Sequence, residues 1–385
     1  MNNTDKESIS LHRRLGGKIA IQPKIRNLRQ RDIGLIYTPG VAAVSKRIRS
    51  HPSEKYSLTS KSNNIAIVTD GTRVLGLGNV GPYAALPVME GKAVLYKRYG
   101  NVDAYPICLN ATKKEEIIST IVSIEPAFGA INLEDIESPK ALEISDELER
   151  MLPIPVFHDD RHGTAVAVLA ALVNSLKVVK KEMESAGIVV AGAGSAGYGI
   201  SELLSFAGCK NVIVTDSAGA IYKNRRKNMN AYKRRIAAMT NRKMRKGVLA
   251  KVLEGADVFI GVSGVSGMLS PSMVRSMGRD PVIFALTNPE PEIKVNAALD
   301  AGAAIVATGS YRHKNKVNNA VVFPYLMRVI LDKRIKRITP KILYHTAMAV
   351  ADSVPKESLG PQRIVPEIGN KRIQRNIRAA LRNVR

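Results

Sequence analysis

Two acidic pairs in the sequence could hold a metal ion. Glu134-Asp135 follows the strand-like run 130–133, and His158-Asp159-Asp160 precedes a long apolar segment. Carboxylate oxygens are the ligands that Mg²⁺ and Mn²⁺ prefer, and the first pair lacks the neighbouring His that would favour zinc. Helix caps and solvated turns account for most acidic pairs in proteins, so their spacing alone leaves that interpretation open.

Lys92 and Tyr37 are candidate acid–base groups. Lys92 stands in the segment 89–93, an otherwise apolar neighbourhood. Burial there would lower its pKa, so that the neutral amine could act as a general base. Tyr37, just before Thr38-Pro39-Gly40, could donate a proton. A surface lysine at a helix start and a ring packed before a turn are the competing interpretations.

The motif with the clearest context is Gly192-Ala193-Gly194-Ser195-Ala196-Gly197, a GxGxxG element. It follows the Val/Ile run 188–190, opens a predicted helix, and is followed about twenty residues later by Asp216 at the end of the next predicted strand. This context predicts a dinucleotide site, in which the glycines let the backbone approach the pyrophosphate at the helix N-terminus. A tight strand–helix turn without a ligand is the alternative.

The choice between NAD and NADP depends on charges that follow the motif. Asp216 would accept hydrogen bonds from the adenosine ribose hydroxyls, which favours NAD. Lys223, Arg225 and Arg226 come shortly afterwards and could reach a 2′-phosphate. We therefore expect NAD as the cofactor, with NADP possible.

The predicted elements around these residues form two α/β units. With 385 residues, of which 45% are hydrophobic, the chain can fill two cores. Strands predicted near 65–68, 104–109 and 130–133 alternate with helices in a mixed α/β unit. From residue 187 the pattern is strictly βαβ, which predicts a Rossmann-like, doubly wound parallel sheet. Pro153 and Pro155 mark the boundary, so we predict an N-terminal catalytic domain over 1–155 and an NAD(P)-binding domain over 156–385 whose last helices pack back on the first domain.

Composition excludes several classes of protein. The two cysteines, Cys108 and Cys209, are far apart and form no CxxC pair, so neither a disulfide framework nor a zinc site is expected. There is no secretory signal and no run of about twenty apolar residues. These features predict a cytoplasmic enzyme without a membrane partner.

The formal net charge of +25 is unusual. The segment 217–250 has eleven Lys/Arg and no acid, and 371–385 adds six more basic residues. Such a field could attract nucleic acid, an acidic membrane surface or anionic metabolites. Because no nucleic-acid motif accompanies the charge, a generally basic surface is favoured, and a nucleic-acid-associated protein on this fold is the alternative.

Several short motifs together resemble those of the malic enzymes. They occur in the family's order, extend from about residue 15 to residue 355, and the length is similar to the short prokaryotic form. The matching motifs are Tyr37-Thr38-Pro39-Gly40-Val41, residues 70–79 around Arg73, Pro87-Val88-Met89-Glu90-Gly91-Lys92, Leu133-Glu134-Asp135-Ile136, Phe157-His158-Asp159-Asp160, Thr287-Asn288-Pro289 and Val317-Asn318-Asn319.

The resemblance implies the oxidative decarboxylation of (S)-malate to pyruvate and carbon dioxide with an NAD(P) cofactor. It implies that Glu134, Asp135 and Asp160 are ligands of Mg²⁺ or Mn²⁺. It further implies that Lys92 takes the proton from the C2 hydroxyl and that Tyr37 protonates C3 of the enolpyruvate. A malolactic-type enzyme, which releases lactate, is the alternative within the same family.

The remaining motif residues are implied to bind malate. Arg73 matches an arginine that holds a malate carboxylate, for which a bidentate fork is suited. Asn288, Asn318 and Asn319 are implied to bind substrate, and Asn288 also lies at the cofactor. Asp159 would lie behind the metal ligands, near Lys92. The resemblance also implies a homodimer or larger homo-oligomer, and Arg161 departs from it, since Gln or an apolar residue is expected there.

Overall fold

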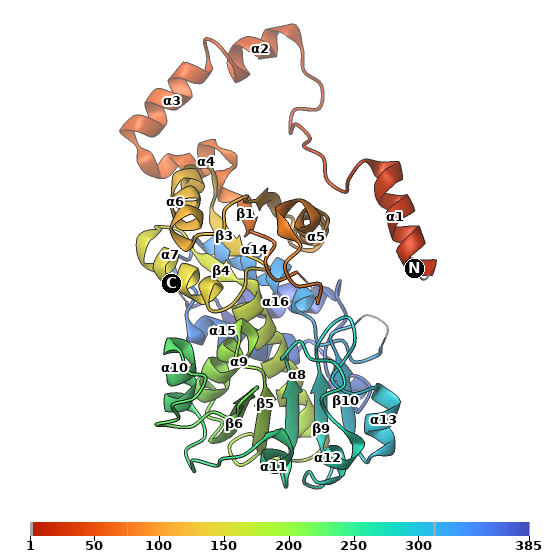
Figure 1. Ribbon diagram of the computed structural model, residues 1–385. Coiled ribbons are helices and arrows are strands. Elements are labelled where there is room, and N and C mark those ends of the chain that lie inside the picture. Colours follow the sequence, from red (N-terminus) through yellow and green to blue (C-terminus); the bar gives the residue numbers. More distant parts are fainter. Residues whose placement is uncertain (1–2, 75, 311–312, 385) are drawn as a thin grey trace.

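The computed structural model describes residues 3–74, 76–310 and 313–384, so Leu75, inside the motif 70–79, lies outside the described residues. The chain forms two parallel sheets, one in the upper and one in the lower half of Figure 1, with helices around both. This architecture confirms the predicted α/β fold class with a doubly wound parallel sheet.

The first sheet has four parallel strands in the order β2-β1-β3-β4. The residues of β1, β3 and β4 are all buried, as expected for parallel strands covered on both faces. The strands are β1 (Asn64–Thr69), β2 (Asp103–Cys108), β3 (Ala130–Leu133) and β4 (Val156–His158). The elements around them are η1 (Pro52–Glu54), α4 (Lys55–Leu58), η2 (Ser60–Ser62), α5 (Gly81–Leu95), η3 (Tyr96–Gly100), α6 (Lys114–Ile124), η4 (Glu125–Ala127) and α7 (Lys140–Met151).

The second sheet has the strand order β10-β9-β8-β5-β6-β7, and only the short β7 is antiparallel. Its strands are β5 (Gly187–Ala191), β6 (Asn211–Asp216), β7 (Gly219–Ala220), β8 (Val258–Gly261), β9 (Val282–Ala285) and β10 (Ile305–Thr308). The helices are η5 (Asp159–Gly163, a π-helix), α8 (Thr164–Val178), α9 (Ser195–Phe206), α10 (Ala231–Met239), α11 (Leu249–Leu253), α12 (Pro271–Arg275) and α13 (Val295–Asp300).

The C-terminal helices contact both halves of the molecule. The ring of Phe323 lies 4.7 Å from that of Tyr96 in η3, while α15 packs against α8. β4 lies in the first sheet, although residues from 156 onward were assigned to the second domain, and the position of the domain boundary stays a prediction. These last elements are η6 (Asn319–Val321), α14 (Phe323–Lys333), α15 (Pro340–Ala351), η7 (Lys356–Ser358) and α16 (Lys371–Ala380).

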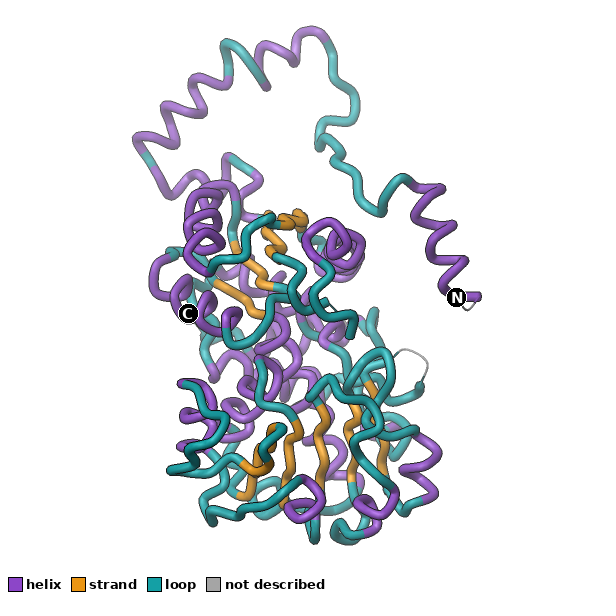
Figure 2. Tube along the Cα trace, viewed as in Figure 1, coloured by secondary structure: helices purple, strands orange, loops and turns teal. Residues whose placement is uncertain are grey.

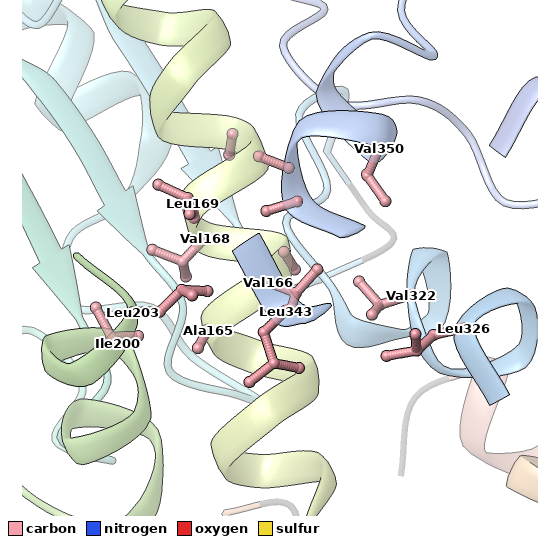
Figure 3. Packing of buried hydrophobic residues seen from close by; sticks show 14 of the residues in the cluster. Ala165, Val166, Val168, Leu169, Ile200, Leu203, Val322, Leu326, Leu343 and Val350 are labelled. Atoms are coloured by element: carbon pink, nitrogen blue, oxygen red, sulfur yellow. The ribbon is translucent and has the colours of Figure 1, made fainter. Parts of the chain in front are cut away.

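Helix α8 lies at the centre of the main hydrophobic core. Eleven of its 15 residues are buried, because α9, α15 and η6 pack around it (Figure 3). A helix that is apolar on all sides is stable only when it is surrounded in this way. None of the helices in 3–74, 76–310 and 313–384 is long and apolar enough to cross a membrane.

Residues 3–50 form an arm that extends away from both sheets (Figures 1 and 2). It contains α1 (Asn3–Leu15), α2 (Gln30–Ile36) and α3 (Val41–Ser50), and none of these helices has a buried residue. Hereafter the arm means residues 3–50, and the body means the described residues that follow it.

Candidate active site

A cavity of about 460 Å³ lies between the two sheets. Because β1, β3, β4 and β9 are parallel within their sheets, the loops after each sheet's strands meet at one edge, where ligands bind in such folds. The cavity brings together side chains that are up to 250 positions apart, from Arg73 to Phe323. Nine of the residues singled out in the sequence line it: Arg73, Lys92, Glu134, Asp135, Asp160, Ala196, Asn288, Asn318 and Asn319.

Lys92, on α5, is held between two carboxylates. Its Nζ donates to Glu134 Oε1 at 2.6 Å and to Asp159 Oδ2 at 2.5 Å, and it lies 4.4 Å from the centre of the Phe323 ring. Burial alone would lower the pKa of Lys92, but the charges of Asp159 and Glu134 and their hydrogen bonds hold it above its ordinary value. The sequence-based expectation of a lowered pKa was therefore wrong for this state, because it considered only the apolar neighbours along the chain.

Glu134 has supporting contacts that the sequence analysis missed. Asn132 in β3 donates from Nδ2 to Glu134 Oε2 at 2.9 Å, and the Tyr96 hydroxyl donates to Asn132 Oδ1 at 2.6 Å. All three groups are buried. A polar Asn within an otherwise apolar strand was the signal that could have revealed this chain of hydrogen bonds.

The two acidic pairs lie side by side. The Asp135 backbone N–H donates to Asp160 Oδ2 at 3.3 Å, and the Asp135 carbonyl accepts from the Arg73 N–H at 2.9 Å. Asp135 has a φ of 51°, in the left-handed region that costs energy for a residue other than glycine. This local strain, held in place by two long-range hydrogen bonds, is typical of a functional loop.

The carboxylates are crowded. Burial is the main reason why the pKa of Glu134 lies well above its ordinary value. The charge of Lys92 opposes this shift, and the nearby carboxylates of Asp159, Asp160 and Asp135 add to it. Burial and the charge of Asp159 raise the pKa of Asp160 to about 6. Against these four acids the cavity lining holds the cationic side chains of Lys92 and Arg73. An excess of negative charge in a cleft suits a divalent cation, and all the donors are the oxygens that Mg²⁺ and Mn²⁺ prefer.

The carboxylates are not yet arranged as a coordination shell. Within the described ranges, no three His, Cys, Asp or Glu side chains converge in a geometry that would hold a metal. Glu134 instead points to Lys92 and Asn132. The donor chemistry therefore fits a hard cation, while Glu134 would have to exchange its contact with Lys92 for one with the ion.

Asp159 is fully buried behind the cavity. Its Oδ2 accepts from Lys92 and from Asn319 Nδ2, which links α5 to η6. Asn318 uses its side chain differently, since Oδ1 accepts from the Ala320 N–H at 2.9 Å and Nδ2 donates to the Gly309 carbonyl at 3.3 Å. Asn319 thus orients the partner of Lys92, and Asn318 caps η6 at the cavity wall.

The three glycines of the dinucleotide motif have different surroundings. A Cβ at Gly192, which has a φ of 122°, would lie 2.6 Å from the Val262 carbonyl oxygen, and a Cβ at Gly197 would lie 1.9 Å from the Gly192 carbonyl oxygen. At Gly194 the nearest atom, in Ser138, is 3.8 Å away. The first and third glycines therefore permit close packing, while the second leaves room beside the backbone, as a pyrophosphate requires. The hydroxyl of Ser195, at the start of α9, is buried and forms no hydrogen bond within the described residues.

Asp216 ends β6, as expected, but its carboxylate is already engaged. Oδ1 and Oδ2 accept from Arg225 at 2.8 and 2.5 Å, and Oδ2 also accepts from Lys233 Nζ at 2.8 Å. Burial would raise the pKa of Asp216, but its hydrogen bonds with Arg225 and Lys233 hold it below the ordinary value. Lys233, on α10, was not among the cations considered from the sequence.

Arg161, next to Asp160 in η5, contacts helices from both halves of the molecule. Its guanidinium donates to Asp146 on α7 at 3.3 Å and to Glu202 on α9 at 3.0 Å, and it stacks over the Tyr198 ring. Arg161, where Gln or an apolar residue was expected, therefore forms ion pairs with nearby acids in this chain.

Tyr37 is not in this cavity. It follows α2 in the arm, and 70% of its surface is exposed. The cavity of one chain thus contains the expected base and carboxylates, while the expected proton donor lies outside it.

Comparison with known proteins identifies the family. The malic enzyme N-terminal domain matches residues 18–149, and the malic enzyme NAD-binding domain matches residues 162–381. The chain belongs to the malic enzyme family. Its relatives include the bifunctional malic/malolactic enzyme of Bacillus subtilis (44% identity over 96% of this chain and 90% of the relative) and the NAD-dependent malic enzyme of Geobacillus stearothermophilus (44%, 98% and 78%).

A solved structure supports the same assignment. The NAD-dependent malic enzyme of Thermotoga maritima has a TM-score of 0.93 and 45% identity, over 98% of this chain and 99% of that one. Because so little of the chain is left out, the alignment includes most of the arm. Members of this family oxidatively decarboxylate malate with a nicotinamide cofactor, and this malic enzyme homologue is accordingly an oxidoreductase.

Proposed function

We propose that the residues around the cavity divide the oxidation and decarboxylation of (S)-malate among them. Lys92 accepts the proton of the C2 hydroxyl in its neutral form, which the loss of its contact with Glu134 to the ion would favour. A bound nicotinamide cofactor would supply the hydride acceptor. Arg73 holds a malate carboxylate with its fork of donors, and Asn288 contacts both malate and the cofactor. The observation that carries this proposal is the Glu134–Lys92–Asp159 bridge at the wall of a cavity that both sheets share.

Glu134, Asp135 and Asp160 are the proposed ligands of Mg²⁺ or Mn²⁺. Bound there, the ion would polarise the C2 oxygen and offset the negative charge that develops as carbon dioxide leaves. Asn132 keeps one oxygen of Glu134 oriented, and Asp159 remains bonded to Lys92 and Asn319. The residues that position the base therefore need not leave it when Glu134 turns toward the ion.

The proposed cofactor is NAD, with measurable use of NADP. Asp216 is the residue that would bind the ribose hydroxyls, and the relatives from Geobacillus stearothermophilus and Thermotoga maritima are named NAD-dependent. However, Arg225 and Lys233 neutralise Asp216, so the repulsion that an unpaired carboxylate would exert on a 2′-phosphate is reduced. We expect a higher kcat/KM for NAD, but a smaller preference than an unpaired Asp216 would produce.

A malolactic activity is the second candidate. It is favoured by the relative that is named a bifunctional malic/malolactic enzyme. Pyruvate with one reduced cofactor per malate would indicate the oxidative reaction, whereas lactate without net cofactor reduction would indicate the malolactic one.

The test is reduction of NAD and of NADP by malate with Mn²⁺, followed by absorbance with and without a chelator, together with product analysis. Metal-dependent reduction that yields pyruvate is expected. Lys92→Ala should lower turnover at least about 100-fold, since general-base catalysis contributes that much or more. A folded protein that reduces neither cofactor would contradict the proposal.

A matched control is available in the same domain. Lys61 is also a buried lysine, bonded to Glu125 at 2.9 Å and to the Phe128 carbonyl at 2.5 Å, but it lies outside the cavity. Lys61→Ala should keep the turnover per folded molecule. If both variants lost activity equally, the loss would reflect a removed buried charge rather than a removed base.

A further inference from the structure

The proposed reaction leaves much of the basic segment 217–250 without a role. Two of its cations pair with Asp216. Three others, Arg242, Lys243 and Arg245, lie on the loop between α10 and α11 and line a second cavity of about 390 Å³. Part of the unusual positive charge of the chain is therefore gathered at one hollow of the surface.

This second cavity lies at the opposite edge of the larger sheet from the active-site cavity. It is lined by Gly187 and Asn211, the first residues of β5 and β6, and by Asp257, just before β8. Val252 of α11, at the bottom of Figure 1, also lines it. The dinucleotide motif follows the other end of β5, about 15 Å away at the usual rise of a strand. A ligand in the second cavity would therefore leave the motif free.

The acid in the lining of the second cavity is already neutralised. Among the described residues that line it, Asp257 is the one carboxylate. Its Oδ1 accepts from Lys181 Nζ at 2.6 Å, and its Oδ2 accepts from the Gly187 N–H at 2.8 Å. The carboxylate therefore does little to offset the positive charge around it.

The cations of the second cavity are largely uncommitted. Lys210 forms an ion pair with Glu184, which does not line the cavity. Arg245 donates to a backbone carbonyl at 3.3 Å. Within residues 3–74, 76–310 and 313–384, no acid forms an ion pair with Arg242 or Lys243, and both side chains are exposed. Their charges are available to an anion from solution.

The loop that carries three of these cations is fixed to the sheet by Asn241. This residue is buried and has a φ of 49°, a conformation that Asn adopts more readily than most residues. Its N–H donates to the Val212 carbonyl at 2.7 Å, and its side chain donates to the Ile221 carbonyl at 2.9 Å and accepts from the Arg245 N–H at 2.8 Å. The backbone is thus ordered before any ligand arrives, which lowers the entropic cost of binding.

We propose that the second cavity binds a small anion with several phosphate groups, either inorganic tripolyphosphate or the triphosphate of a nucleotide. Arginine forks and lysine ammonium groups are the side chains that bind phosphate in proteins. The volume lies within the range of small-molecule sites, roughly 300–1,000 Å³. A nucleic acid would need a longer basic stripe that follows many phosphates, whereas these cations surround one hollow.

Calorimetric titration of the full-length chain with tripolyphosphate tests the site. A metal-free buffer with saturating NADH keeps the dinucleotide motif occupied. Arg242→Gln/Lys243→Gln should weaken binding at least about tenfold, because two charge-assisted contacts are lost. The control Lys227→Gln/Arg234→Gln removes the same charge from exposed positions of the same segment that do not line the cavity. It should change the affinity less than about twofold.

Two results of this titration would overturn the proposal. Equal weakening in both double variants would mean that the anion responds to overall charge rather than to the cavity. A wild type that binds no tripolyphosphate up to about 10 mM would mean that the cations form no site.

Further titrations of the same proteins distinguish the sources of the phosphate groups. ATP that binds at least about tenfold more tightly than tripolyphosphate would identify a nucleotide, and equal affinities would show that the phosphate chain alone is recognised. Duplex DNA that binds more tightly than either probe, and loses its affinity in Arg242→Gln/Lys243→Gln, would replace the small-anion site with a nucleic-acid surface.

Discussion

The arm and helix α8 contain the same kinds of apolar residue, but these side chains are exposed in the arm and buried in α8. In α8, Val166, Val168 and Leu169 are fully buried, and α9, α15 and η6 pack around the helix (Figure 3). In the arm, Leu35 and Ile21 are exposed at 72 and 85%. Apolar content alone therefore does not say where a segment will be buried. The core covers α8 on all sides, whereas α1, α2 and α3 have no buried residue among those that the structure describes.

The difference has a consequence for catalysis. Everything that positions Lys92 comes from the body, through Glu134, Asp159 and the ring of Phe323. The position of Tyr37, by contrast, is set by the arm, where it follows α2. The position of the proposed base should therefore be as stable as the core, whereas the position of Tyr37 depends on a segment without a buried helix.

The largest expected effect is in the core. Leu169→Ala should lower the free energy of unfolding by about 3 kcal/mol, because it leaves a cavity in a region that is packed on all sides. Urea denaturation at a fixed protein concentration measures this change. A loss below about 1 kcal/mol would mean that α8 is less tightly enclosed than Figure 3 shows.

A smaller effect is expected from a buried histidine of the body. Burial, with a contribution from Arg161, lowers the pKa of His158 from 6.5 to about 3. The unfolded chain therefore takes up the proton first as the pH falls, so His158 stabilises the fold above pH 6.5 and this contribution is lost between pH 6.5 and 3. Between pH 7 and pH 5 the wild type should lose about 2 kcal/mol more than His158→Asn. Equal losses in denaturation at the two pH values would contradict a neutral, buried His158.

The smallest effect on folding is expected in the arm. Leu35→Ala is the same substitution as Leu169→Ala, but it should change the free energy of unfolding of the body by less than about 0.5 kcal/mol. The reason is that the Leu35 side chain is largely exposed, so its removal leaves no cavity. Urea denaturation of the two variants under the same conditions measures the difference. If Leu35→Ala destabilised the body as much as Leu169→Ala, the arm would pack on its own chain.

Much of the fold and part of the site could be predicted from local sequence. The GxGxxG motif with its flanking strand and helix, the position of Glu134 after a strand and that of Asp160 before an apolar helix depend on neighbours along the chain. Parallel strands then bring their carboxyl ends to one edge whatever the details of packing. The grouping of the acids with Arg73 and Lys92 was implied by the resemblance to the malic enzymes, and these side chains line the same cavity.

The sequence by itself therefore determined the fold class, the family and the set of groups that surround the cavity. Only the tertiary structure decided the pKa values of those groups, the ion pairs that they form and which of them lie in the cavity. Lys92 has a raised pKa because acids 42 and 67 positions away meet at its Nζ, and Asp216 is paired with a lysine on a later helix. Tyr37 lies outside the cavity, in an arm whose helices have no buried residue among those that the structure describes. Electrostatic and packing energies depend on distance in space, which spacing along the chain does not provide.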